Sequence, residues 1–146
     1  AEWCKTFIAE NGLLNVSMRG FVDNDKIMDL IAESKALILP TQWYEGFPMT
    51  IVESLACGTP VIGSNIGNVG SLIEDGKTGI RFEFDSSGSV IEAVRNLSDM
   101  TESCGNVFRN NYQPEINYQL LLSIYENIIT SKKTSDLNII RKGNKS

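Results

Sequence analysis

Apolar residues along the chain alternate between two patterns, the three-to-four-residue period of a helix and the short apolar run of a strand. The helical pattern predicts helices within residues 2–12, 23–34, 48–57, 67–76 and 87–98, and it recurs to about residue 130. Strands are predicted over residues 15–21, 36–41, 60–65 and 78–84. Asn11-Gly12 is a typical helix end, and Asp23 or Asn24 is a typical helix N-cap.

Strand and helix in strict alternation predict an α/β fold, a Rossmann-like open parallel sheet with helices on both faces. The run 36–41 is continuously apolar, as in a strand that is buried on both faces. No internal repeat or second domain is visible. We therefore expect one domain over residues 1–131, followed by a tail over residues 132–146.

Charge is distributed unevenly between these two parts. The tail carries five basic residues and one Asp, a net charge of +4. Since the whole chain carries −5, the body carries −9. Such an acidic body argues against nucleic acid as a partner. The polar, basic tail is expected to be mobile and is a candidate for peripheral contact with an anionic membrane face.

Three cysteines and no histidine bound the chemistry further. The cysteines are widely spaced and complete no zinc set, and we interpret them as reduced thiols of a cytosolic protein. No secretory signal or membrane-spanning segment is predicted. The first residue is Ala, so the chain is expected to be a piece of a longer protein.

The candidate chemistry lies in "WYEGFPMTIVESLACGTPVI", residues 43–62. It follows a predicted strand, and ligands of such sheets bind where strand ends lead into helices. Pro48 suits the first helical position, so the free N–H groups near Met49 and Thr50 would form an anion site without basic side chains. Gly46 would let a ligand approach the backbone closely.

Two glutamates flank this anion site. Glu45 precedes the helix, and Glu53 lies about five residues into it, roughly 7 to 8 Å along the axis. The strip that holds Glu53 also contains Thr50 and Cys57, and the predicted core strip is a separate set: Val52, Leu55 and Ala56. A ligand with an anionic middle and a hydroxylated group at each end fits this spacing, and a nucleoside diphosphate sugar is such a molecule.

"EGFPMTIVE" followed by "SLACGTPVIGSNIGNVGSLIEDGKTGI" resembles the donor-binding domain of the retaining GT-B glycosyltransferases, the glycosyl transferases group 1 family with its Glu-x7-Glu motif. The resemblance runs from about Asn15 to about Thr130. It implies that Glu45 is catalytic, contacting the transferred sugar, and that Glu53 binds the ribose. It further implies diphosphate contacts from the amides near Gly46, Phe47, Met49 and Thr50, and backbone beside the base at Gly20, Phe21 and Val22.

The chain departs from the family pattern at two positions and lacks some of the family's usual parts. Pro48 stands where the family usually has Gly, and Gly70-Ser71 stands where it often has Pro-Glu. The Arg and Lys that clamp the diphosphate in the family have no counterpart, nor does the N-terminal acceptor domain. The resemblance thus implies a partial C-terminal domain, inactive alone, that uses no metal or cofactor and acts with that acceptor domain.

Other interpretations remain open. The chain could be a non-catalytic GT-B-like binding module or partner subunit, or an epimerase of the same fold. Without its motif, Glu45 would be an ordinary solvated charge near a helix start. Trp43 and Tyr44 are interpreted as packing residues of the core or of the rim, with a role in shaping the sugar pocket as the alternative. The resemblance itself implies hexosyl transfer in bacterial polysaccharide or glycolipid synthesis, in the cytoplasm or on the inner membrane face.

Overall fold

The computed structural model describes the backbone of residues 2–143 and the side chains as far as Ser131. Its centre is a three-stranded sheet in the order β1-β2-β3, comprising β1 (Leu37–Leu39), β2 (Val61–Ser64) and β3 (Gly79–Phe82). Both pairings are parallel, with Ile38 opposite Ile62 and Ile62 opposite Ile80. Strand, helix and strand follow one another through this part of the chain, as the sequence predicts.

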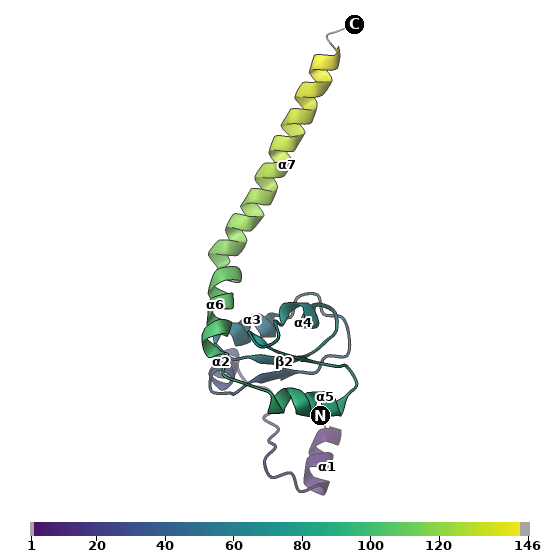
Figure 1. Ribbon diagram of the computed structural model, residues 1–146, viewed down its shortest axis with the longest axis vertical. Coiled ribbons are helices and arrows are strands. Elements are labelled where there is room, and N and C mark those ends of the chain that lie inside the picture. The colour runs from purple at the N-terminus through teal and green to yellow at the C-terminus, as the bar shows by residue number, and fades with distance from the viewer. Residues whose placement is uncertain (1, 144–146) are drawn as a thin grey trace.

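Seven helices accompany the sheet in the described part of the chain: α1 (Glu2–Glu10), α2 (Asn24–Ala32), α3 (Met49–Ala56), α4 (Gly67–Leu72), α5 (Ser87–Arg95), α6 (Thr101–Asn111) and α7 (Pro114–Gly143). The helices α3 and α4 cover one face of the sheet and α5 covers the other (Figure 1). The predicted fold class, a parallel sheet with helices on both faces, is therefore confirmed.

The core is divided by the sheet into two clusters, because successive side chains of a strand point to opposite faces. Val61 packs with Ile51 and Leu55 of α3 and with Cys104 of α6. Ile62, one residue later, belongs to the cluster on the other face, with Phe82 and Ala93. All four residues of β2 are buried, so β2 is the central strand that fixes the layers on each side.

Two predictions about strands are wrong. Residues 15–21 form no strand, since an apolar pattern predicts an extended backbone but supplies no neighbouring strand to pair with. The run 36–41 is not buried on both faces, because β1 lies at the edge of the sheet and Ile38 is 48% exposed.

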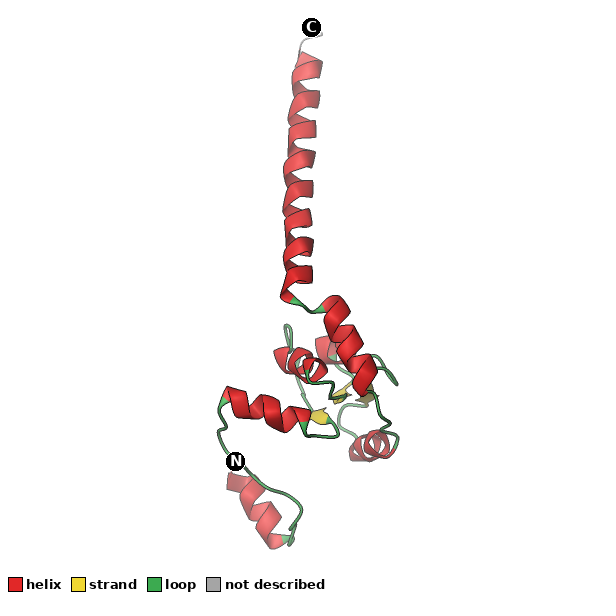
Figure 2. Cartoon of the chain, turned by 90° about the vertical axis from the view of Figure 1, so that its left-hand side faces the viewer, coloured by secondary structure: helices red, strands yellow, loops and turns green. Residues whose placement is uncertain are grey.

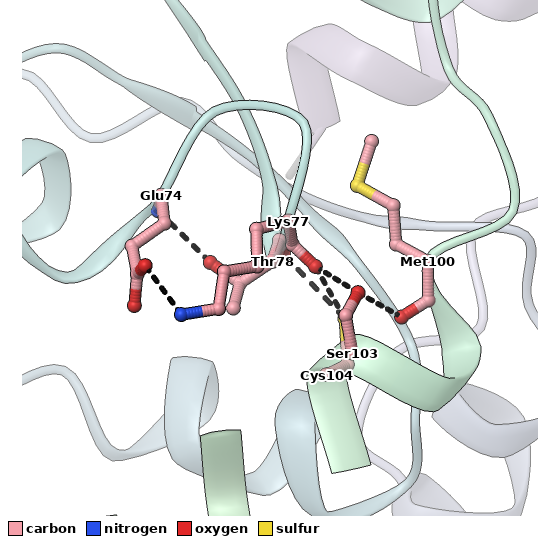
Figure 3. A network of polar contacts seen from close by, with 6 residues as sticks. All are labelled: Glu74, Lys77, Thr78, Met100, Ser103 and Cys104. Atoms are coloured by element: carbon pink, nitrogen blue, oxygen red, sulfur yellow. Dashed lines mark hydrogen bonds and ion pairs between the residues drawn. The ribbon is translucent and has the colours of Figure 1, made fainter. Parts of the chain in front are cut away.

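The turn before β3 is fastened to α6 (Figure 3). The backbone N–H of Glu74 donates to Thr78 Oγ1 over 2.9 Å, and Lys77 pairs with the Glu74 carboxylate at 2.7 Å. Ser103 Oγ donates to the Lys77 carbonyl, and Cys104 Sγ lies 3.7 Å from the carbonyl oxygen of Thr78. These contacts hold the start of β3 against the helix layer.

Both ends of the described chain project from the sheet (Figure 2). None of the residues of α1 is buried, and the 30-residue α7 leads away from α6. The backbone of residues 132–143 continues α7, whereas the side chains of the tail, and all of residues 144–146, lie outside the described residues. The mobility and membrane contact expected of the tail stay predictions. Within the described residues, no helix combines the length and apolar character needed to cross a membrane.

Candidate functional site

The Glu45 carboxylate is fixed by neighbours in the loop that joins β1 to α3. Thr41 Oγ1 and Trp43 Nε1 each donate a hydrogen bond to Glu45 Oε1, both over 3.2 Å. The carbonyl of Thr41 accepts a hydrogen bond of 2.7 Å from Ser64 Oγ, at the buried end of β2. The loop is therefore attached to the central strand, and the carboxylate is attached to the loop.

Neither aromatic residue of this loop is a core residue. Trp43 is 69% exposed and Tyr44 is 80% exposed, so packing does not explain them. Trp43 instead donates to Glu45, and the ring of Tyr44 lies against Gly67 at the start of α4. Core packing is therefore ruled out for both rings, whereas packing at the rim and a role in shaping the sugar pocket stay predictions.

The start of α3 presents free backbone donors. Pro48 is buried and is the N-cap rather than the first helical residue, with extended backbone at φ −73° and ψ 93°. Ile51 N–H donates to the Pro48 carbonyl over 3.0 Å. The N–H groups of Met49 and Thr50 have no acceptor among the described residues. They are the unpaired donors that every helix start leaves, and they carry the positive end of the helix dipole.

Glu53 lies on the side of α3 that faces α2, apart from the core. It is the fifth residue of α3 and is partly exposed. Cys57, one turn further along, is also partly exposed, and its Sγ lies 3.7 Å from the Met28 carbonyl oxygen of α2. Burial raises the pKa of the Cys57 thiol, and the negative charges of Glu53 and Asp29 raise it further. The strip predicted for Glu53 and Cys57 is thus real.

The predicted core strip of α3 needs a correction. Val52 and Leu55 are buried as expected, but Ala56 is exposed. Ile51 and Ser54 are buried in its place. The core face is centred on Ile51 and Leu55 because α3 packs between β2 and α6, a direction that the sequence of one helix does not specify.

Gly20, Phe21 and Val22 lie on the turn that leads into α2. Phe21 is 94% exposed, and Gly20 has a φ of +68°, which favours glycine. Phe21 and Val22 line an open hollow of about 340 Å³ together with Arg19, Asp23 and Lys26.

This turn and the start of α3 lie toward the same edge of the layer. The middle of α2 contacts the end of α3, where Cys57 Sγ is 3.7 Å from the Met28 carbonyl oxygen. The last turn of α2 contacts the segment between α3 and β2, where Thr59 Oγ1 donates to the Ile31 carbonyl over 2.8 Å. The C-terminal ends of α2 and α3 are therefore close to each other, and both helices lead into the same layer. The loop between β1 and α3, residues 40–48, is called the Glu45 loop below. Among the described residues, no hydrogen bond joins residues 20–22 to it.

Sequence reasoning missed Asn68, which reaches the loop from α4. Its Nδ2 donates to the Glu45 carbonyl over 3.1 Å and also to the Gly46 carbonyl. Asn68 follows β2 just as Glu45 follows β1, so the rule that ligand sites gather beyond adjacent strand ends would have placed it near the site, without identifying its contacts.

A second hollow of about 340 Å³ lies at the amino ends of the strands. Lys35 and Pro60, which lead into β1 and β2, are among the residues that line it. None of the predicted site residues lines it. The described residues also contain no group of three or more Cys, Asp or Glu side chains arranged to hold a metal ion.

A parallel α/β layer with a fixed carboxylate and free helix N–H groups beyond one strand defines a domain of the class that binds ligands at the carboxyl edge of its sheet. The chain belongs to the glycosyl transferases group 1 family, whose sequence profile matches residues 2–114.

Sequence relatives and structures of similar fold agree with that assignment. The N-acetyl-alpha-D-glucosaminyl L-malate synthase of Bacillus anthracis is 28% identical over 117 residues, which cover 78% of this chain and 30% of that enzyme. A glycosyltransferase from Rickettsia africae superposes with a TM-score of 0.75 at 25% identity, over 86% of this chain and 35% of its own. HepE of Anabaena, solved in complex with UDP, superposes with a TM-score of 0.71 at 22% identity, over 86% and 36%.

These neighbours are glycosyltransferases of the GT-B fold. The chain spans about a third of the length of each of the proteins compared above. The recognised family and the fold are thus established for the domain. The activity, substrates and partners of a whole glycosyltransferase are therefore proposals for this chain.

Proposed function

We propose that this chain is the donor-binding domain of a retaining glycosyltransferase that takes a nucleoside diphosphate sugar. The observation that carries the proposal is the Glu45 carboxylate, held through Oε1 by Thr41 and Trp43 beside a helix start with free N–H donors. The UDP complex of the structural neighbour HepE supports the same class of ligand.

Each predicted residue has a role in this proposal. The amides of Gly46, Phe47, Met49 and Thr50 hold the diphosphate, because backbone N–H groups and the helix dipole favour an anion. Glu53 accepts hydrogen bonds from the ribose hydroxyls. The backbone of residues 20–22 lies beside the base.

Glu45 acts on the sugar that is transferred. A retaining transfer passes through an oxocarbenium-like transition state, and a fixed carboxylate stabilises its positive charge more than it stabilises the ground state. The pair of hydrogen bonds to Oε1 holds this charge in place before the reaction. No residue of this chain is assigned to the acceptor, which we place on an N-terminal domain of the natural full-length protein.

The setting follows from the same proposal. We expect no metal, since helix N–H groups take the place of a cation at the diphosphate. We expect hexosyl transfer in bacterial polysaccharide or glycolipid synthesis, in the cytoplasm or at the inner membrane face.

The test uses the full-length protein that contains this chain. Ligand-observed NMR against UDP, GDP and ADP sugars identifies the donor, and calorimetry measures nucleotide affinity. Glu53→Gln should weaken nucleotide binding by about ten- to hundredfold, because hydrogen bonds to a charged acceptor are worth about 1.5 to 3 kcal/mol each. Glu45→Gln should leave nucleotide affinity within about twofold while transfer falls by about a hundredfold, the pattern of an interaction that strengthens in the transition state.

Glu92→Gln is the matched control, because Glu92 is exposed on α5 and its side chain makes no hydrogen bond or ion pair among the described residues. It should change neither measurement. Nucleotide binding with no transfer in the parent protein would favour a non-catalytic module instead. Parent-like behaviour of both the Glu45 and the Glu53 variant would refute the assignment.

A further inference from the structure

The Asn68 side chain holds two successive peptide groups of the Glu45 loop. Its two amide hydrogens are donated to the carbonyls of Glu45 and Gly46, which belong to adjacent peptide bonds. In a trans peptide the C=O and the N–H point in opposite directions. The N–H groups of Gly46 and Phe47 therefore point away from Asn68.

Those two N–H groups are unpaired. Neither Gly46 N–H nor Phe47 N–H has an acceptor among the described residues. A Cβ placed on Gly46 would meet no atom within 4 Å, so the surface beside this peptide is open. Adjacent N–H groups that point the same way form a concavity that favours an anion. With the donors of Met49 and Thr50, they form one set interrupted only by Pro48.

The first residue of α4 secures the same loop. Gly67 has a φ of +49°, and a Cβ built there would lie 2.7 Å from Tyr44 Cδ1. The Tyr44 ring thus occupies the space above a backbone that has no side chain. Gly67 and Asn68 together hold the loop at positions 44, 45 and 46, which are 22 to 23 residues earlier in the chain.

We propose that Asn68 is a positioning residue that turns the Gly46 and Phe47 N–H groups toward the donor diphosphate. The inference deepens the proposed function and rests on it. Asn68 itself touches neither sugar nor phosphate; it acts through the two peptides that it holds. Its effect should therefore appear in the recognition of the second phosphate rather than in the chemistry of transfer.

The experiment compares nucleoside diphosphates with monophosphates. In the full-length protein, calorimetry gives the affinities for UDP, GDP and ADP and for UMP, GMP and AMP. Asn68→Ala should reduce the preference for the diphosphate about three- to tenfold, the range expected for two solvent-accessible hydrogen bonds, while monophosphate affinity changes less than twofold. At saturating donor, kcat should change less than KM.

Two further variants keep the test decisive. Asn68→Leu keeps the volume without a donor and should match Asn68→Ala, whereas Asn110→Ala, an exposed α6 asparagine whose side chain makes no hydrogen bond among the described residues, should match the parent. A parent-like diphosphate preference in both Asn68 variants overturns this inference alone, as does an equal loss of both nucleotide classes. If the parent protein binds no nucleoside diphosphate, the proposed function fails, and this inference fails with it.

Discussion

The Glu45 carboxylate has an asymmetric environment that suits one chemical task. Both of its hydrogen bonds reach Oε1, and among the described residues none reaches Oε2. Threonine and tryptophan donors are neutral, so they orient the carboxylate without neutralising its charge. A fixed, uncompensated negative charge is what an oxocarbenium-like transition state requires from its neighbour.

Cys104 offers a residue-level test of the core that supports the site. It is fully buried, and burial raises the pKa of its thiol from 9.0 to about 11. Because the folded state disfavours the thiolate, the free energy of unfolding should decrease between about pH 9 and 11. At pH 8 we expect iodoacetamide to alkylate Cys104 far more slowly than the partly exposed Cys4, as measured by peptide mass spectrometry.

The control for this prediction is the same reaction in urea. Once the chain is unfolded, Cys104 and Cys4 should react at similar rates because neither thiol is buried. Equal rates in the native protein would mean that the Cys104 side chain is not enclosed in the core between α6 and the sheet.

At the element scale, the pairing of β2 with β3 depends on a glycine. Gly79 lies opposite Val61, and a Cβ there would fall 1.9 Å from the Val61 carbonyl oxygen. Gly79→Ala should therefore destabilise the protein by about 1 to 3 kcal/mol or more, since the strands must separate to admit the methyl group. Urea unfolding followed by circular dichroism measures the change.

Gly88→Ala is the matched control for Gly79→Ala. Gly88 is the second residue of α5, and the nearest atom to a Cβ there, Ser86 Oγ, is 4.0 Å away. Alanine gains about 0.5 to 1 kcal/mol over glycine in the middle of a helix, so Gly88→Ala in the first turn should stabilise the protein by up to about 0.5 kcal/mol. The prediction is wrong if both variants shift stability in the same direction.

The elements that the sequence predicts well are those whose pattern and neighbours agree. The runs that became β2 and β3 are flanked by turn residues and have strands beside them, and both form strands of a parallel sheet as expected. Residues 15–21 have the pattern without a partner. The helix start at Met49 follows from local chemistry, although Pro48 is a cap rather than the first residue.

The candidate site divides in the same way. Glu45 and Glu53 can be predicted because both belong to one contiguous motif. Asn68 cannot be predicted from that motif, because its bonds to the loop depend on how α4 lies across the layer. The same limit applies to Ser64, whose contact with Thr41 joins two strand ends.

At the scale of the whole molecule, the layered part and the projecting helices differ in character. The layers bury a core on both sides of β2. The described part of α7 instead leaves large apolar side chains exposed, namely Tyr118, Leu120, Leu121, Leu122, Ile124, Tyr125, Ile128 and Ile129. Helices stabilised by little packing open easily, so α7 amides should exchange with solvent faster than those of α3.

The last prediction concerns what residues 1–146 can do as a separate protein. The β1–α3 loop and α3 contain no Lys or Arg, so the proposed diphosphate contacts come from N–H groups alone. After circular dichroism shows that the purified chain is folded, calorimetry should find UDP or GDP bound only at about millimolar Kd, which corresponds to about −4 kcal/mol. No sugar transfer should be detected, because the proposed acceptor site belongs to another domain. Micromolar binding would mean that a further anion contact exists within this chain, with Arg19 and Lys26 beside the α2 turn as the first residues to substitute. Measurable transfer would place the acceptor site here as well, and the division of labour between two domains would then be wrong.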